Sequence, residues 1–355
     1  MTTEIKRQIA SVLDKLNSIE DLTWNEENWR RFMKLHWHSR ETITINNRFN
    51  VTPEEFEQWQ SQLGRCGKEH AEYEPQTGKI TFKPDHCPVR RTIRAVMNQW
   101  LCELELRLRR MILCMELVRY IALFFFFFLL MIEKQTDGFR LSGQHEGCFR
   151  TTDLHLRRGD QKYPTVVVEI AFAEPTETLF QRAKMWLDGT NGTTQLVMLF
   201  DIKEGRPPSR KSKYVKQGNQ TWNLTDEQLT SMFPAFWPLY HYIISWYYQK
   251  KISLTGRFSV DMYLWGSDMP EPDKIWGCVS GDHNQPPVED RHNGIGTASK
   301  FCFYGMSIPF PIEVLQREIN KGIKFKAFER AADFAVEKLR ELNLPFGGYL
   351  RRVEG

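Results

Sequence analysis

The pattern of apolar and polar positions predicts alternating helices and strands along most of the chain. Residues 89–110 repeat apolar side chains at helical spacing. Residues 163–172 read as a strand, because four successive β-branched residues, Thr165 to Val168, suit a strand buried on both faces. The other predicted helices cover 4–20, 53–63, 176–188, a stretch from 225, and one or two helices over 312–343. The predicted β elements are a hairpin over 72–82 and strands over 139–143, 147–156, 195–202 and 258–265. A loop is predicted over 266–299, and irregular or β structure over 301–311.

Local signals mark several boundaries of these elements. Thr52 followed by Pro53 and, at the third position, Glu55 is typical of a capped helix start. The segment from Gly189 to Gly192 predicts the end of the helix over 176–188.

The run of thirteen apolar residues from Tyr120 to Ile132 lacks both helical and strand periodicity. At a helical rise of 1.5 Å it covers only about 20 Å of a roughly 30 Å bilayer core, so we expect no stable membrane span. Extension to residues 111–132 gives enough length but includes Glu116 and Arg119. A buried element, a membrane anchor and a translated non-coding segment remain as interpretations.

Composition and charge narrow the class of protein. The hydrophobic fraction of 41% and charged fraction of 26% are close to the globular average and exclude a wholly disordered or multi-span membrane chain. A net charge of +4 permits a polyanionic partner without requiring one. Seven cysteines without a CxxC pair argue against a disulfide framework or a zinc cluster. The polar start over residues 1–6 carries no secretory signal, so we expect the cytoplasm or nucleus.

At the usual 100–200 residues per domain, a chain of 355 residues predicts about two domains or one domain with large extensions. The predicted parts are a helical N-terminal extension over 1–70, an α/β core over 71–204 with the apolar insert at 120–132, a basic linker over 205–220, and an α+β extension over 221–355.

The linker carries five cations within eleven residues. A basic run of this kind can contact phosphates, or it can be a solvated loop. The candidate nucleic-acid-binding residues are Arg206, Arg210, Lys211, Lys213 and Lys216.

Two carboxylates lie at the ends of neighbouring predicted strands. Asp153 falls near the end of one short strand, and Glu169 falls at the far end of the next. Burying a carboxylate is costly unless it is paired or binds a metal. If the two acids converge within about 4–7 Å, they can share Mg²⁺ or Mn²⁺, which lowers the pKa of a bound water. A salt bridge or a sheet-edge charge is the alternative.

The order of these parts resembles the core of the PD-(D/E)XK, or restriction-endonuclease-like, nuclease superfamily. The segment that carries the resemblance is YPTVVVEI at 163–170, followed by a polar stretch, the helix LFQRAKMWL at 179–187 and the strand at 195–202. The match is closest to uncharacterised fungal proteins and to bacterial restriction-endonuclease-type proteins with this core. It covers residues 72–204 and, more faintly, elements after 250.

The resemblance implies roles for individual residues. Asp153 and Glu169 would hold the metal, although Thr152 stands where the family usually has proline. Ala171 replaces the lysine that in the family activates the attacking water. Some members move this cation to the following helix. The candidates on the helices are Lys184, with Arg182 in reserve, Gln181 facing the site, and Glu103 or Glu105 as an extra acid.

The resemblance implies a Mg²⁺- or Mn²⁺-dependent phosphodiesterase acting on DNA, or a degenerate descendant of one. The alternative is a non-catalytic module with a nuclease-like fold that binds nucleic acid or protein. A protein tethered to a membrane through 111–132 is a third hypothesis. No GxSxG, Walker or GxGxxG motif occurs, so the sequence supports no hydrolase triad, nucleotide site or small-molecule cofactor.

Overall fold

The computed structural model describes residues 43–45, 52–62, 71–82, 87–116, 138–157, 161–205, 226–233, 236–249, 254–279, 288–289, 300–303 and 306–341. Three sequence-based predictions therefore lie outside the described residues. They are the helix over 4–20, the apolar run over 120–132 and the cations of the basic linker.

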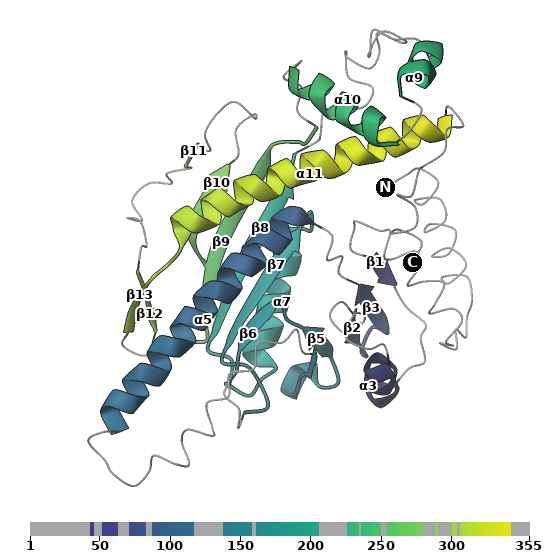
Figure 1. Ribbon diagram of the computed structural model, residues 1–355. Helices are drawn as coiled ribbons and strands as arrows, with labels where there is room; N and C mark the ends of the chain where they lie inside the picture. The colour runs from purple at the N-terminus through teal and green to yellow at the C-terminus, as the bar shows by residue number, and fades with distance from the viewer. Residues whose placement is uncertain are drawn as a thin grey trace.

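A six-stranded mixed sheet forms the centre of the fold (Figure 1). Its order is β11-β10-β9-β8-β7-β6, in which β7 and β8 are parallel and the other pairs are antiparallel. The strands are β6 (Leu154–Leu156), β7 (Val166–Phe172), β8 (Leu196–Glu204), β9 (Phe258–Gly266), β10 (Asp273–Val279) and β11 (Val288–Glu289). Because β9, β10 and β11 join this sheet, strands on both sides of the predicted linker share one core.

Helices cover both faces of this sheet. On one face α5 (Pro88–Glu116) and α11 (Ile312–Glu341) pack over Val166, Val168 and Ile170, and on the other α7 (Thr176–Asp188) packs over Val167 and Ala171. Figure 1 shows α5 and α11 in front of the sheet and α7 behind it. Burial of alternate residues toward two helical layers explains the uninterrupted β-branched run of β7. The fold is therefore mixed α/β.

The α5–α11 contact depends on a glycine at the crossing. A Cβ atom at Gly322 would lie 2.9 Å from the Val89 Cα atom and 3.1 Å from the Pro88 carbonyl oxygen. Both neighbours are backbone atoms, which cannot rotate away as a side chain can. The glycine thus lets the two helices approach closely.

We expect Gly322→Val to lower the free energy of unfolding by about 1–3 kcal/mol, because the added methyl groups force the helices apart. Urea unfolding measures this change. Lys321→Val, at the neighbouring exposed position, is the control and should change stability by less than about 0.5 kcal/mol. Equal stability of the two variants would show that the crossing can relax.

A second sheet of five strands has the order β1-β3-β2-β5-β4. Its strands are β1 (Ile43–Ile45), β2 (Ala71–Glu74), β3 (Lys79–Phe82), β4 (Gly138–Arg140) and β5 (Phe149–Thr151). Helix α3 (Pro53–Gln62) packs beside β2, and its predicted capping box is confirmed. The Glu55 N–H donates to Thr52 Oγ1 at 3.2 Å, and the Thr52 N–H donates to the Glu55 carboxylate at 2.8 Å.

Most of the predicted elements are confirmed. They are the hairpin over 72–82, the helices at 89–110, 176–188 and 312–343, and the strands at 163–172, 195–202 and 258–265. The remaining elements are the 3-10 turn η1 (Gly143–His145), α9 (Asp226–Met232), α10 (Phe236–Gln249), β12 (Lys300–Phe303) and β13 (Met306–Pro309).

Two predictions about strands were wrong. The predicted strand over 147–156 breaks at Thr152 and Asp153, so that β5 joins the small sheet and β6 joins the large one. The predicted loop over 266–299 contains β10 and β11. Antiparallel pairing with the preceding strand β9 stabilises β10, although the segment is rich in turn residues that disfavour strands.

None of the helices within the described residues has the length and apolar character that crossing a membrane requires.

Candidate acidic site and adjoining groove

Glu169 lies in the middle of β7, with its side chain on the face covered by α7. Its carboxylate is fully buried and accepts a hydrogen bond of 2.9 Å from the Trp186 indole N–H. The Nε atom of Arg182 lies 3.5 Å from the other carboxylate oxygen. The residue therefore has a neutral donor and a cation from the same helix.

Asp153 lies in the break between β5 and β6 and is also buried. One carboxylate oxygen accepts the Ile170 backbone N–H at 2.7 Å. The other accepts two hydrogen bonds from Arg90 of α5, at 2.6 Å from Nη2 and 3.1 Å from Nε. Charged donors on one oxygen and a backbone donor on the other fix the orientation of the carboxylate.

Asp153 in the break before β6 and Glu169 on the neighbouring strand β7 bond to helices on opposite faces of the sheet. Asp153 bonds to α5, whereas Glu169 bonds to α7. Within the described residues no group of three or more His, Cys, Asp or Glu side chains is placed to hold a metal ion. The pair as arranged does not fit a shared Mg²⁺ or Mn²⁺ ion, because protein donors already bind both carboxylates; metal dependence stays a prediction.

Arg182 is the buried cation whose Nε atom lies 3.5 Å from the Glu169 carboxylate. Its Nη1 atom makes a short ion pair with Glu174. Burial alone would lower the pKa of this guanidinium, but the carboxylates of Glu174, Glu169, Glu72 and Asp153 raise it above its ordinary value. Arg182 therefore stays charged and acts as the shared counter-charge of an acidic cluster.

The other helix residues suggested by the resemblance lie elsewhere. Lys184 and Gln181 are exposed and line a groove beside α7. Glu103 is exposed and pairs with Arg107, whereas Glu105 is buried on α5. The lysine-replacing Ala171 is fully buried against α7. The cation in contact with Glu169 is thus the reserve candidate Arg182 rather than Lys184.

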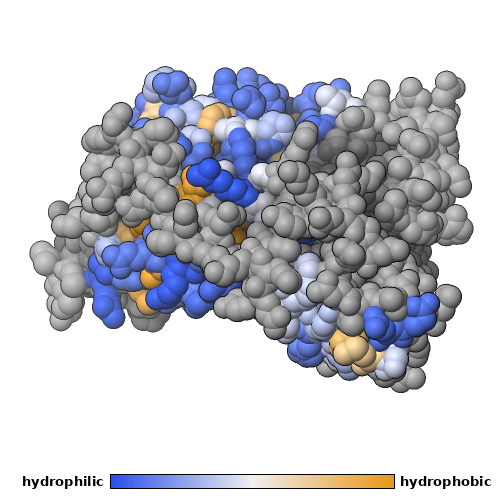
Figure 2. Space-filling model, turned by 90° about the horizontal axis from the view of Figure 1, so that it is seen from above, coloured by the Kyte–Doolittle hydropathy of each residue, from blue (hydrophilic) through white to orange (hydrophobic). Residues whose placement is uncertain are grey.

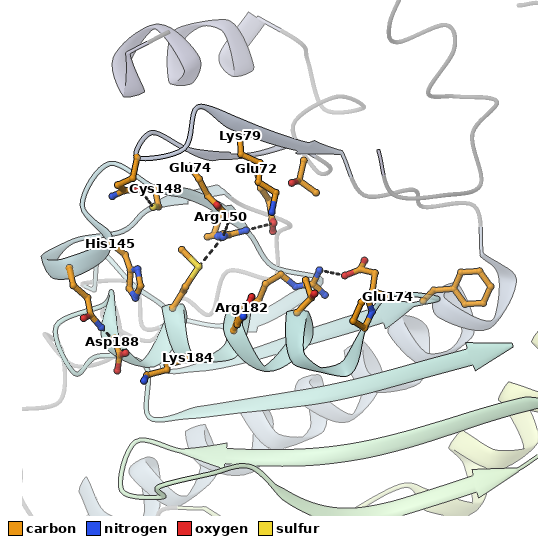
Figure 3. A pocket seen from close by; sticks show the side chains of 18 of the residues that line it. Glu72, Glu74, Lys79, His145, Cys148, Arg150, Glu174, Arg182, Lys184 and Asp188 are labelled. Carbon is orange, nitrogen blue, oxygen red and sulfur yellow. Dashed lines mark hydrogen bonds and ion pairs between the residues drawn. The ribbon is translucent and has the colours of Figure 1, made fainter. Parts of the chain in front are cut away.

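The groove, of about 910 Å³, separates α7 from the small sheet (Figure 3). Arg150 of β5 reaches into it from the sheet and pairs with Glu72 at 2.6 Å and with Glu74. Opposite, Figure 3 shows Arg182 turned toward Glu174. The charged lining balances: the acids are Glu72, Glu74, Glu174 and Asp188, and the bases are Lys79, Arg150, Arg182 and Lys184.

His145 and Cys148 also line the groove, but they lack the features of a nucleophile and its base. The Cys148 thiol donates a hydrogen bond of 3.2 Å to the Gln76 side-chain oxygen. Burial raises the pKa of this thiol and lowers the pKa of His145. A protonated thiol is a weak nucleophile, so this pair does not support cysteine catalysis.

Sequence reasoning missed Arg90, the partner of Asp153, and Arg150, the partner of Glu72 and Glu74. A signal for Arg90 exists, because it precedes the buried Ile93 and Met97 at helical spacing and so falls on the buried face. Arg182 likewise follows Leu179 by three residues and precedes Trp186 by four. No comparable local signal places Arg150 beside Glu72, which is 78 positions away in the chain.

Comparison with known proteins adds no family to this picture. No family model matches the chain, and neither curated proteins nor solved structures give a match.

Proposed function

We propose that this chain is a nucleic-acid-binding protein with a restriction-endonuclease-like core whose acidic pair does not hydrolyse phosphodiesters. The order of elements supports the nuclease-like core. Helix α5 precedes the short strands, Asp153 stands just before β6, Glu169 lies on β7, and α7 leads to β8, which is parallel to β7.

The arginine pairing of the two acids is the observation that carries the proposal. Asp153 is bonded by Arg90, and Glu169 lies beside Arg182, with all four side chains no more than 7% exposed. Hydrolysis by this class of nuclease needs carboxylates that bind a metal and a cation that assists its water. Here arginines neutralise the carboxylates, and the exposed Lys184 is not the cation beside Glu169.

Binding without hydrolysis is supported by charge in the linker. Five cations, Arg206 to Lys216, follow soon after β8, which ends at Glu204. Each phosphate that such residues neutralise releases counterions, so binding of this kind weakens steeply as the salt concentration rises. We therefore assign nucleic-acid contact in part to these linker residues.

Incubation of the purified chain with supercoiled plasmid and Mg²⁺, Mn²⁺ or EDTA tests the proposal. We expect retarded plasmid in a gel-shift assay, weaker binding at higher salt, and no cleavage in any of the three conditions. A Lys211→Ala/Lys213→Ala variant should weaken retardation and flatten its salt dependence, whereas Lys184→Ala, on α7, should not.

Cleavage that depends on Mg²⁺ or Mn²⁺ and disappears in Glu169→Gln and Asp153→Asn would overturn the proposal in favour of the metal-dependent nuclease. Absence of any plasmid retardation at low salt would remove the nucleic-acid-binding part.

A further inference from the structure

Helix α11 has apolar residues on two opposite faces. Leu315, Ile319 and Ile323 are buried in the core shared with α5. On the outer face Phe325 and Phe328 are 55% and 46% exposed. They are two of the five large apolar side chains that are exposed within the described residues, and they lie three residues apart on one helix.

The exposed phenylalanines continue a line of cations along the same face. The exposed residues of α11 between positions 317 and 328 are Arg317, Lys321, Lys324, Phe325 and Phe328, here named the α11 stripe. Their spacings of three, four and seven residues place them on one side of a helix. At 1.5 Å per residue the stripe is about 16 Å long.

The charged side chains of the α11 stripe itself are all cations. Glu318 pairs with Arg317 at 3.1 Å and with Lys321 at 2.7 Å, so one carboxylate serves two cations. Lys324 makes no ion pair within the part of the chain that the structure describes. The acid Glu313 lies one turn before Arg317, so the basic part begins at Arg317. The stripe therefore carries three exposed cations and is flanked by two half-buried carboxylates, Glu318 and Glu329, of which Glu329 pairs with Arg91 and Lys326.

In Figure 1 α11 crosses in front of the sheet beside α5, and α10 lies along the C-terminal half of α11. Seen from above, the described surface carries hydrophobic residues directly beside strongly hydrophilic ones (Figure 2). On α11 itself the exposed Phe325 and Phe328 lie next to the exposed Lys321 and Lys324, unlike the continuous apolar face with which a helix packs.

We infer that the α11 stripe is a binding surface for single-stranded nucleic acid. Phosphates of the strand match the positive charge of Arg317, Lys321 and Lys324, and unstacked bases match the flat faces of Phe325 and Phe328. Base stacking on aromatic rings is independent of sequence, since every base has a π-face. The inference rests on the proposed nucleic-acid binding and assigns it a surface separate from the linker.

Fluorescence anisotropy with labelled fifteen-nucleotide oligothymidylate, at several salt concentrations, tests the inference. We expect Phe325→Ala/Phe328→Ala to weaken binding at least tenfold at every salt concentration without changing the salt slope, because stacking contributes about 1–3 kcal/mol per base. We expect Lys321→Ala/Lys324→Ala to reduce the magnitude of the slope by about 1.4, the value for two phosphate contacts on a single strand.

Two matched controls separate the stripe from general surface effects. Leu106→Ala removes an apolar residue of α5 that is 55% exposed, and Lys184→Ala removes an exposed cation of α7. Both variants should bind the oligonucleotide like the unaltered chain. Circular dichroism and urea unfolding of every variant check that the fold is retained.

The possible outcomes distinguish failure of the α11 stripe as the binding surface from failure of the proposed nucleic-acid binding. Binding of the oligonucleotide with less than a twofold effect of the phenylalanine variant refutes the stripe but leaves nucleic-acid binding intact. Failure of the unaltered chain to bind any nucleic acid refutes both. Binding to vesicles of anionic lipid that needs Phe325 and Phe328, without oligonucleotide binding, would make the stripe a membrane-contact surface instead and overturn the inference.

Discussion

Arg182→Met should lower the free energy of unfolding by about 3–5 kcal/mol, the usual cost of removing one partner of a buried ion pair. The substitution removes the guanidinium that pairs with Glu174 and lies 3.5 Å from Glu169. Glu169 is fully buried, so water cannot replace the lost cation. Urea unfolding followed by fluorescence measures the change.

Restoring the charge balance should recover part of this loss. Glu169→Gln in the Arg182→Met chain removes the buried negative charge, while its amide oxygen can still accept the Trp186 hydrogen bond. Lys184→Met, an exposed position on the same helix, is the control and should shift stability by less than about 0.5 kcal/mol. Equal stability of Arg182→Met and the unaltered chain would show that Arg182 is not the counter-charge of the cluster.

Acidification should destabilise the fold through His155. Burial lowers the pKa of this imidazole to about 4 from its ordinary value of 6.5. Between these two values the unfolded chain binds a proton that the folded chain does not, so stability falls as the pH falls from about 6.5 to about 4. The shift corresponds to about 3 kcal/mol.

The surroundings of His155 explain why protonation is unfavourable there. Nδ1 lies 3.0 Å from the Thr152 hydroxyl, the Phe139 ring packs edge-on against the imidazole, and the Arg157 guanidinium lies over the same Phe139 ring. Among the described residues, no carboxylate lies against the imidazole to stabilise its charged form.

Urea unfolding between pH 4 and pH 7 isolates this effect by comparison. His155→Gln has no titrating ring at this position and should show a shallower loss of stability over that range. His241→Gln, at an exposed position of α10, should follow the unaltered chain. Parallel profiles for His155→Gln and the unaltered chain would mean that other groups cause the acid sensitivity.

The cations beside Asp153 and Glu169 are the arginines Arg90 and Arg182, whereas the resemblance implied a lysine at position 171. Position 171 holds a fully buried alanine, so no cation approaches Glu169 from its own strand. Arg182 approaches instead from α7, but it is itself bound to Glu174. A guanidinium keeps its proton at all ordinary pH values and cannot act as a base, whereas a lysine in the same place could titrate. Arg90 and Arg182 are therefore suited to neutralise the buried carboxylates of Asp153, Glu169 and Glu174 permanently.

Sequence reasoning identified the two acids and, as a reserve candidate, Arg182, but it did not identify Arg90. It also placed Glu169 at the far end of its strand, whereas Glu169 lies in the middle of β7. Glu169 on a doubly buried strand was predictable from the β-branched run before it, and α7 was predicted with the bounds that the structure gives. Asp153 was expected within or at the end of a strand, yet it occupies the break between two sheets. The difference matters, because that break lets its carboxylate accept the Ile170 N–H and reach Arg90.

The sequence by itself determined the local elements, since helical and strand periodicity depend on neighbours a few residues apart. It determined the capped start of α3, the buried β7 and the length of α7. Only the tertiary structure decided that β5 and β6 belong to different sheets, that β10 adds to β9, and that arginines from two opposite helices neutralise the two acids. These pairings join residues from 9 positions apart, as between Leu264 and Asp273, to 63 positions apart, as between Arg90 and Asp153. Their free energy depends on burial that no local pattern encodes.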